Sequence, residues 1–181
     1  MKLNNKYYLL RHGQTIYQTE KKDLIYPPFK SDNVPLTKIG RKQIEVVAKK
    51  LKKEKVDFIY SSDLLRTRQT AEIVAKKLSI KKIIFTERLR DINFGVYHNR
   101  KKEEYYFQFP RFSKKRFLKA PKNGESWLKA QKRILDFLKE IDKKHKGKTI
   151  LIVSHGDPLW LLEGGVKEWS QDKLLAEKKA N

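Results

Sequence analysis

The chain has 181 residues, with 43 Lys or Arg against 21 Asp or Glu, so its formal net charge is +22. This length fits one domain, and a hydrophobic content of 39% is enough to form a buried core. The absence of cysteine excludes disulfides, thiolate metal sites and cysteine nucleophiles. We therefore expect a globular protein with an unusually charged surface.

The positive charge comes from 33 Lys and only 10 Arg, spread along the whole chain. Surfaces dedicated to phosphate recognition use more arginine, so this composition favours a solvated lysine coat over a nucleic-acid footprint. A field of this strength still attracts anionic ligands. No apolar run approaches the ~20 residues that span a membrane, and the N-terminal apolar run is too short for a signal peptide. These features predict a cytoplasmic protein that does not enter the membrane.

Short apolar runs alternate with helical patterns, which is typical of repeated βα units around a mainly parallel sheet. In chain order, strands are expected at residues 7–10, 56–60, 83–86 and 149–153. Helices should begin after Thr37, after Ser62 or Asp63, and at about Glu125, the last of these ending near Lys144. From about Gln171 the chain should form a terminal helix or tail. The expected fold is a three-layer α/β/α sandwich with a mainly parallel central sheet.

Each of these three helices carries one apolar stripe at the spacing that faces a core. The residues expected to be buried are Ile44, Val47, Ala48 and Leu51, then Ala71, Val74, Ala75 and Leu78, then Ala130, Ile134, Phe137, Leu138 and Ile141. The sheet should therefore be covered by helices.

The stretch 97–122 interrupts the alternation, because it holds nine Lys or Arg, seven Tyr or Phe, and prolines at 110 and 121. We expect it to form a small basic insertion over the carboxyl edge of the sheet, in the position of a lid. No linker or internal repeat divides the chain. Residues 1–181 are therefore expected to form one domain.

Two of the four histidines follow predicted strands and precede glycines, in Arg11-His12-Gly13 and in Ser154-His155-Gly156. The carboxyl ends of neighbouring parallel strands meet at the ligand crevice of such sheets, so His12 and His155 can meet there. Glycine after each histidine lets the backbone approach a ligand closely. Neither histidine is followed by the usual spacing of zinc ligands, so no metal or other cofactor is expected.

Arginines accompany these histidines, since Arg11 adjoins His12 and Arg66 opens the helix after the second strand. Guanidinium groups match phosphate oxygens in a bidentate way, and their charge favours a neutral, nucleophilic imidazole. Two imidazoles and two guanidiniums at three strand ends predict a site for a phosphate dianion. The residue pattern thus favours a small phosphate ester as the ligand.

The chain resembles the histidine phosphatases, in the branch that includes cofactor-dependent phosphoglycerate mutases and small broad phosphatases. The resemblance extends from about Tyr7 to Leu162 and rests on six motifs in the family's order. These motifs are RHGQT at 11–15, PLTKIGRKQ at 35–43, SSDLLRTRQTAEI at 61–73, ERLRDINFG at 87–95, NGES at 123–126 and SHG at 154–156.

The resemblance implies phosphoryl transfer through a phosphohistidine, with His12 as the nucleophile. Arg11, Arg66 and His155 would hold the oxygens of the transferred group. The aligned acid is Asp91, which would protonate the leaving oxygen and then activate water. Thr15 and Gly156 match positions that touch substrate or phosphate.

Two positions depart from the family's pattern. The acid is usually Glu, so Asp91 is one methylene shorter, a difference of roughly 1.5 Å in reach, and Glu87 is the alternative acid. Gln18 stands where Asn commonly contacts the phosphate, and we expect it to offer its amide on a longer arm. The PLT and GES motifs also suit structural roles, with Ser126 or Asn123 as the cap of the long helix. Arg133 on that helix is expected to be a surface cation.

The basic insertion should lie beside the mouth of the site. Its cations are expected to bind a second negative group of the substrate; they are Arg100, Lys101, Lys102, Arg111, Lys114, Lys115 and Arg116. Its aromatic residues are expected either to stack on a ring of the substrate or to pack the lid onto the domain; they are Tyr105, Tyr106, Phe107 and Phe109. Only 25 residues follow Gly156, which favours a phosphatase over the mutases with their longer C-terminal parts. The alternatives are a mutase, or a module that binds nucleic acid or an acidic partner. The sequence predicts no oligomeric state.

Overall fold

The structure is a computed structural model that describes residues 1–180. Its sheet has four parallel strands in the spatial order β1 (Lys6–Arg11), β4 (Thr149–Ser154), β2 (Phe58–Ser62) and β3 (Ile83–Thr86). The predicted ranges of three strands are confirmed to within one residue. The second strand begins two residues late, because the carboxylate of Asp57 binds the amide of Thr149 and occupies the start of the ladder.

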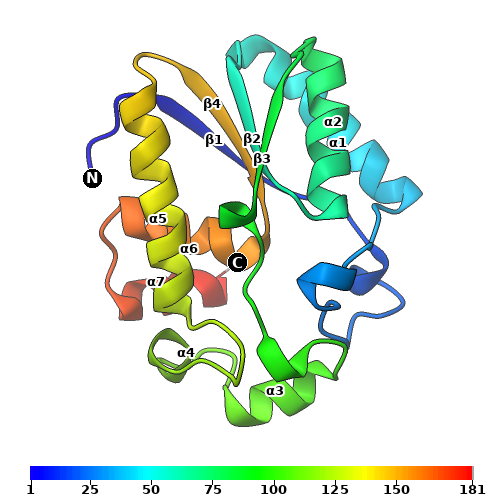
Figure 1. Ribbon diagram of the computed structural model, residues 1–181, viewed down its shortest axis with the longest axis vertical. Coiled ribbons are helices and arrows are strands. Elements are labelled where there is room, and N and C mark those ends of the chain that lie inside the picture. Colours follow the sequence, from blue (N-terminus) through cyan, green and yellow to red (C-terminus); the bar gives the residue numbers. More distant parts are fainter. Residues whose placement is uncertain (181) are drawn as a thin grey trace.

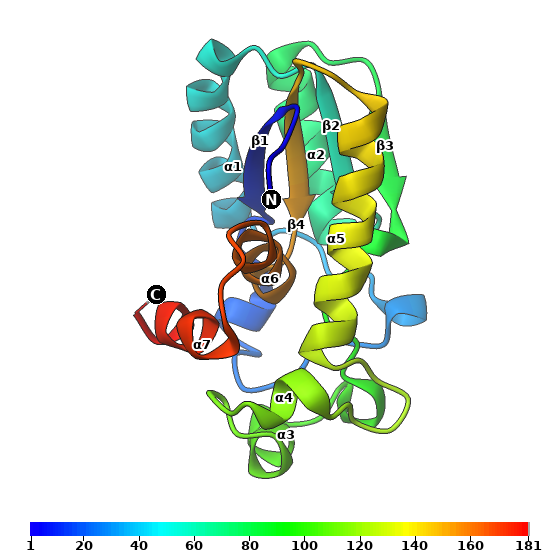
Figure 2. The ribbon, with the colours of Figure 1, turned by 90° about the vertical axis from the view of Figure 1, so that its left-hand side faces the viewer.

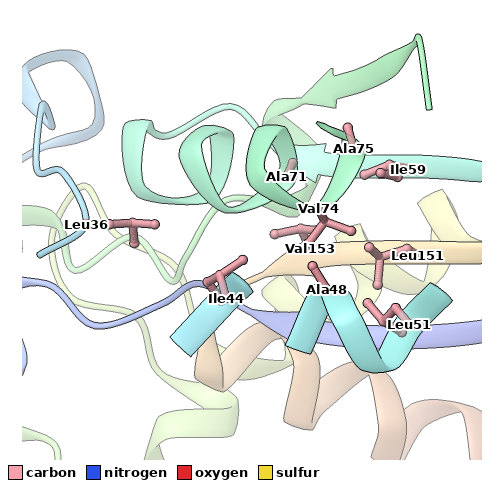
Figure 3. Packing of buried hydrophobic residues seen from close by; sticks show 10 residues of the cluster. All are labelled: Leu36, Ile44, Ala48, Leu51, Ile59, Ala71, Val74, Ala75, Leu151 and Val153. Carbon is pink, nitrogen blue, oxygen red and sulfur yellow. The ribbon is translucent and has the colours of Figure 1, made fainter. Parts of the chain in front are cut away.

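One face of the sheet is covered by α1 (Lys38–Leu51) and α2 (Leu65–Leu78). Because neighbouring residues of a strand point to opposite faces, Ile59, Leu151 and Val153 all point to this side. Figure 3 shows them interleaved with the predicted stripes of the two helices, which include Ile44, Ala48, Leu51, Ala71, Val74 and Ala75.

The other face is covered by α5 (Trp127–Lys144) and α6 (Gly156–Val166). Here the alternate strand residues Tyr60, Ile150 and Ile152 contact the stripe of α5, which is buried as predicted at Ile134, Phe137, Leu138 and Ile141. Apolar residues on both faces are what a buried parallel sheet requires. The three-layer α/β/α arrangement is therefore confirmed (Figures 1 and 2).

Local hydrogen bonds start two of the helices as the sequence predicts. Thr37 Oγ1 accepts from the amide of Gly40, and Ser126 Oγ accepts from that of Lys129. The prediction for α2 is wrong, because its N-cap is Leu64 and no side chain caps it. Arg90 binds both carboxylate oxygens of Asp63, and Ser62 Oγ contacts His155, so both expected caps have other partners.

The basic stretch forms α3 (Lys102–Gln108) and α4 (Lys115–Leu118), which lie beyond the carboxyl ends of the strands (Figures 1 and 2). Tyr105 and Phe109 pack with Ile25 in a small core of their own. The C-terminal stretch is a helix, α7 (Gln171–Ala180). Short 3₁₀ turns lie at Ile16–Gln18, Phe29–Ser31, Lys52–Glu54, Glu87–Leu89 and Gly95–Tyr97. Within residues 1–180, no helix combines the length and apolar character needed to cross a membrane.

Candidate active site

The register between β1 and β4 brings the two strand-end histidines together. Arg11 of β1 is paired with Ser154 of β4, and the amide of His12 donates to the Ser154 carbonyl at 3.1 Å. The imidazole centroids of His12 and His155 lie 5.3 Å apart. Both rings are buried at the carboxyl edge of the sheet. The predicted meeting of the two histidines is confirmed.

The imidazole of His12 is neutral, and its tautomer is set by the backbone. Its Nδ1 lies 2.8 Å from the carbonyl oxygen of Gly13 and must donate a proton there, which leaves Nε2 with a free lone pair. Burial lowers the pKa of His12 to about 3, and the charges of Arg66 and Arg11 act in the same direction. Nε2 can therefore serve as a nucleophile at neutral pH.

The RHG loop is held by close backbone packing against the start of α1. A Cβ at Gly13 would lie 2.5 Å from the Gly40 carbonyl oxygen, and one at Gly40 would lie 2.2 Å from that of Gln14. Thr37 donates its amide to the carbonyl of Gln14 and its hydroxyl to the Gln14 side chain. These contacts give the PLTKIG motif the structural role expected of it, which is to position the loop that carries His12.

His155 presents one ring nitrogen to the site. Its Nε2 lies 3.0 Å from Ser62 Oγ, whereas Nδ1 is buried without a hydrogen-bond partner and lies 3.8 Å from Asp91 Oδ2. Burial lowers the pKa of His155 well below its usual range, with Arg66 and His12 adding to the effect. A serine hydroxyl donating to Nε2 leaves a proton on Nδ1. His155 can then donate a hydrogen bond to an anion in the site.

Arg66 is fully buried and is held from two sides. Its Nη1 donates to Asp32 Oδ2 at 2.6 Å, and its guanidinium carbon lies 4.0 Å from the ring centre of Tyr26. Its Nε and Nη2 are buried and have no hydrogen-bond partner. Two donors of one guanidinium thus remain available for a ligand, in the fork geometry that fits phosphate. Asp32 and Tyr26 were not predicted, because the irregular stretch between β1 and α1 has no periodicity that reveals buried residues.

Thr15 and Gln18 both hydrogen-bond to the hydroxyl of Tyr26, and Gln18 also lines the active-site cavity. The fully buried Thr15 hydroxyl lies 2.6 Å from the Tyr26 hydroxyl, and Gln18 Nε2 donates to the same hydroxyl at 2.7 Å. Gln18 Oε1 accepts from both the amide and the hydroxyl of Thr15. Their side chains therefore support the ring that lies against Arg66. The sequence predicts that Gln18 offers its amide to phosphate. In the structure its longer side chain folds back onto its own 3₁₀ turn, and the amide binds Tyr26.

Asp91 lies between the second histidine and the buried arginine. Its Oδ2 is 3.8 Å from His155 Nδ1 and 3.9 Å from Arg66 Nη2, and its Oδ1 accepts from the amide of Ile92. Burial raises the pKa of Asp91 to about 6, with Asp157 adding to the rise and Arg66 opposing it. A carboxyl that keeps its proton up to about pH 6 can act as a general acid.

The alternative acid, Glu87, lies elsewhere. Its side chain is 74% exposed and forms an ion pair with Arg90 at 2.9 Å. It therefore points to solvent. The geometry favours Asp91 as the acid of this site.

The expectation that Arg133 is a surface cation is wrong. Its Nε and Nη2 bind the two carboxylate oxygens of Glu125 at 2.9 and 2.8 Å. Its Nη1 donates to the carbonyls of Arg88 and Arg90, and Nη2 to that of Asp91. The long side chain reaches from α5 across the acid segment, a contact that no local pattern in the helix reveals. Arg133 thus fixes the backbone that carries Asp91.

His12 and Asp91 line a cavity of about 620 Å³, together with Arg11 and Gly156. A Cβ at Gly156 would lie 3.7 Å from the guanidinium carbon of Arg11, so Arg11 lies across the start of α6. Of the five predicted catalytic residues, His12, Asp91 and Arg11 line the cavity, and the buried Arg66 and His155 lie within 4 Å of Asp91, so the structure brings all five to one place.

Three of the seven basic residues expected at the mouth line this cavity, namely Lys102, Arg111 and Arg116. The other four do not line it. Arg100 forms an ion pair with Glu104, and Lys114 forms one with Asp172. Lys115 lies over the ring of Phe109, and Lys101 lies outside the cavity. The aromatic residues also differ in position. Phe109 packs inside the insertion, Tyr105 packs there and also lines the cavity, Tyr106 lines the cavity, and Phe107 is exposed.

One side of the cavity is closed by α6 and α7 around Asp157. Its Oδ1 accepts from Lys178 at 2.5 Å, and its Oδ2 accepts from the indole of Trp127 at 3.2 Å and from Arg116 at 3.4 Å. Arg116 also stacks on Trp127 at 3.9 Å. This cluster ties the insertion to the C-terminal helix, and it leaves Arg116 largely neutralised. In the described part of the chain, no three His, Asp or Glu residues are grouped so that they could hold a metal ion.

Comparison with known proteins identifies the class. A model of the histidine phosphatase superfamily (branch 1) matches residues 7–179, and the chain belongs to this superfamily. The resemblance seen in the sequence motifs is thereby confirmed.

Two curated relatives come from Arabidopsis thaliana. A metal-independent phosphoserine phosphatase is 33% identical over 159 residues, which cover 83% of this chain and 64% of the relative. A phosphoglycerate mutase-like protein 4 is 35% identical over 156 residues, covering 82% of this chain and 65% of the relative. The chain thus spans slightly less than two thirds of the length of either relative. Among solved structures, Bacillus stearothermophilus YhfR is 30% identical with a TM-score of 0.76, covering 94% of this chain and 83% of that one.

Proposed function

We propose that the protein is a phosphomonoesterase that acts through a phosphohistidine at His12. The observation that carries this proposal is a neutral, buried imidazole with a free Nε2, beside a buried guanidinium that has two unpartnered donors. In the first step, Nε2 attacks phosphorus, the ester P–O bond breaks, and the leaving oxygen takes the proton of Asp91. In the second step, Asp91 removes a proton from water, which attacks phosphorus and releases phosphate from His12.

Charge stabilisation in both steps falls to the donors that have no partner of their own. Arg66 Nε and Nη2 and His155 Nδ1 are buried and unpartnered, and Arg11 lines the cavity beside them. Donors fixed in a water-poor site stabilise the equatorial oxygens of the transferred group more strongly than water does. Asp32, Tyr26 and Ser62 keep these donors in place through the contacts described above.

We further propose that the substrate is a small metabolite with a second anionic group, and that the chain is one domain in which residues 97–122 act as a lid. Lys102 and Arg111 support this proposal, because they line the cavity and, within residues 1–180, neither forms an ion pair with a carboxylate. The relative named for phosphoserine acts on an ester of this kind. A phosphate ester with a carboxylate or second phosphate would supply the missing counter-charge.

The direct test is to trap the intermediate. Incubation with a ³²P-labelled aryl phosphate followed by denaturation should label the wild-type protein with a bond stable in alkali and labile in acid. His12→Ala should abolish both the label and turnover, and EDTA should leave turnover unchanged. Wild-type turnover in His12→Ala would refute the proposal. Assays on 3-phosphoglycerate with and without 2,3-bisphosphoglycerate test the mutase alternative, which predicts interconversion of phosphoglycerates instead of phosphate release.

A further inference from the structure

The active-site cavity does not end at the insertion. A second hollow of about 630 Å³, here called the outer groove, is lined by residues 22–23, 102–103, 106–107 and 111. Three of these residues, Lys102, Tyr106 and Arg111, also line the active-site cavity. The two spaces therefore adjoin, and the side chains of α3 and the loop after it form their boundary.

The volume of these spaces is large for a three-carbon phosphate ester. A cavity of about 620 Å³ lies within the range that encloses drug-sized ligands, roughly 300–1,000 Å³. A three-carbon ester bound at His12 would leave most of this volume, and the whole outer groove, to water. The space beyond the phosphate position thus fits a much larger leaving group.

The boundary between the two spaces is positively charged. Lys102 donates to the carbonyl of Lys22 and, like Arg111, has no carboxylate within ion-pair distance in the described chain. Burial lowers the pKa of Lys102, and Arg111 and Arg11 add to the effect, whereas Asp23 opposes it. Cations that repel one another at a cavity wall favour an anionic group between them.

An exposed aromatic side chain borders the outer groove. Phe107 is 83% exposed, the highest value for a large hydrophobic residue within 1–180. A lone exposed hydrophobic residue is ordinary on a protein surface, but this one lies in the same groove as Tyr106 and Arg111. Aromatic rings beside cations are the surface on which the bases of nucleotides stack.

Two acidic residues limit what the groove accepts. Asp23 and Glu103 line it together with the cations. Their charge opposes a phosphate backbone that continues through the groove, as a long nucleic acid would require. A ligand with one ring and one anionic group can place its charge between the cations and brings no further negative charge beside Asp23 and Glu103.

From these observations we propose that the leaving group of the substrate is of nucleotide size, with a second phosphate or carboxylate between Lys102 and Arg111 and a planar ring against Phe107 in the outer groove. This inference rests on the proposed phosphomonoesterase activity and goes beyond it in naming the leaving group. A nucleoside bisphosphate has this chemistry.

The test compares matched esters of one sugar: ribose 5-phosphate, adenosine 5′-monophosphate and adenosine 3′,5′-bisphosphate. We expect kcat/KM to rise about tenfold on adding the ring and about tenfold again on adding the second phosphate, each step equivalent to about 1.4 kcal/mol. Phe107→Ala should remove the first gain and Arg111→Gln the second. The exposed Leu118→Ala and Lys101→Gln, which line neither space, serve as controls.

Equal kcat/KM for the three esters, or equal losses in Phe107→Ala and Leu118→Ala, would overturn this inference. A 5′-phosphorylated oligonucleotide turned over better than the mononucleotide would also overturn it, since it would point to nucleic acid as the substrate. An aryl phosphate separates these outcomes from failure of the proposed activity. If the wild type hydrolyses the aryl ester and His12→Ala does not, the activity stands even where the leaving-group inference fails.

Discussion

At the scale of single residues, the surroundings of Asp91 compensate for its shorter side chain. Although it is one methylene shorter than the acid of the family's pattern, it lies within 4 Å of both His155 and Arg66, and burial raises its pKa to about 6. The proton that an ester oxygen needs is therefore present up to about that pH. Above it, the carboxyl is ionised and the acid step slows.

Asp91→Asn should lower kcat strongly for alkyl phosphates, by about a hundredfold, and much less for aryl phosphates, whose oxygens leave without a proton. In the wild type, kcat for alkyl esters should decline as pH rises through about 6. Steady-state kinetics on the two ester types across pH 5–8 measures both effects. Equal losses on both types would remove Asp91 from the role of acid, and a larger loss in Glu87→Gln would transfer that role.

A second residue-scale prediction concerns the partner of Arg66. Asp32→Ala leaves a fully buried guanidinium without its carboxylate, which should lower the free energy of unfolding by about 3–5 kcal/mol. Asp32→Asn keeps an oxygen that accepts from Nη1, so it should lose less stability. In that variant a raised KM for all phosphate esters would report the misplaced arginine. Urea titration measures the stability, and Asp136→Ala, which breaks an exposed pair, is the control. Unchanged KM and stability in both Asp32 variants would contradict this role.

At the scale of elements, α5 does more than cover the sheet. Its N-terminus is capped by Ser126 and its apolar stripe packs under β2 and β4, as the pattern predicts. About two turns along the same helix, Arg133 crosses to the segment 88–91 and binds three of its carbonyls. The helix thus carries both a packing face and a support for the acid.

Arg133→Gln should therefore lower kcat for alkyl phosphates about tenfold, because the acid shifts relative to the leaving oxygen. KM should change little, since the donors around the phosphate stay in place. Lys132→Gln, on the solvent side of the same helix, is the matched control. A loss of equal size on aryl esters would mean that Arg133 acts on overall folding instead of on the acid.

At the scale of the whole molecule, the shifted pKa values of the active-site residues His12 and Asp91 make the free energy of unfolding depend on pH. The pKa of His12 is about 3 in the folded protein and about 6.5 in the unfolded chain, so the unfolded state binds more protons between these values. Stability from His12 is complete above pH 6.5 and is lost as pH falls toward 3. Asp91 acts in the opposite sense, because its pKa is raised: its contribution is complete below about pH 3.8 and is lost as pH rises through about 6.

Between about pH 4 and 6 these two contributions oppose each other, while the lowered pKa of His155 adds to the effect of His12, so the free energy of unfolding should decrease as pH falls below 6.5. His12→Ala should make this slope less positive by up to about 1.4 kcal/mol per pH unit. Asp91→Asn should steepen it. Urea titrations between pH 4 and 7 measure these slopes. A slope unchanged in His12→Ala would show that the histidine is not buried in its neutral form.

Local patterns in the sequence were sufficient for the four strands, for the three long helices and for the central residues, whereas α3, α4 and α6 were not predicted. Alternation and helical spacing placed four strands and the buried stripes of three helices, because a sheet covered on both faces needs apolar residues at those periods. The two histidines were found because strand ends of a parallel sheet share one edge. Arg66 was found through its motif, and its partner was not.

What only the tertiary structure decided are contacts between segments far apart in the chain. Asp32 and Tyr26 against Arg66, and Arg133 against the carbonyls beside Asp91, join elements that no local period relates. Within the basic insertion, composition could not separate Lys102 and Arg111, which line the cavity, from Lys114, which pairs with α7. Residue type and spacing determine which face a side chain occupies within its own element. Which partner it meets depends on how the elements pack, and this packing sets the burial, the charge neighbours and the pKa values on which the chemistry depends.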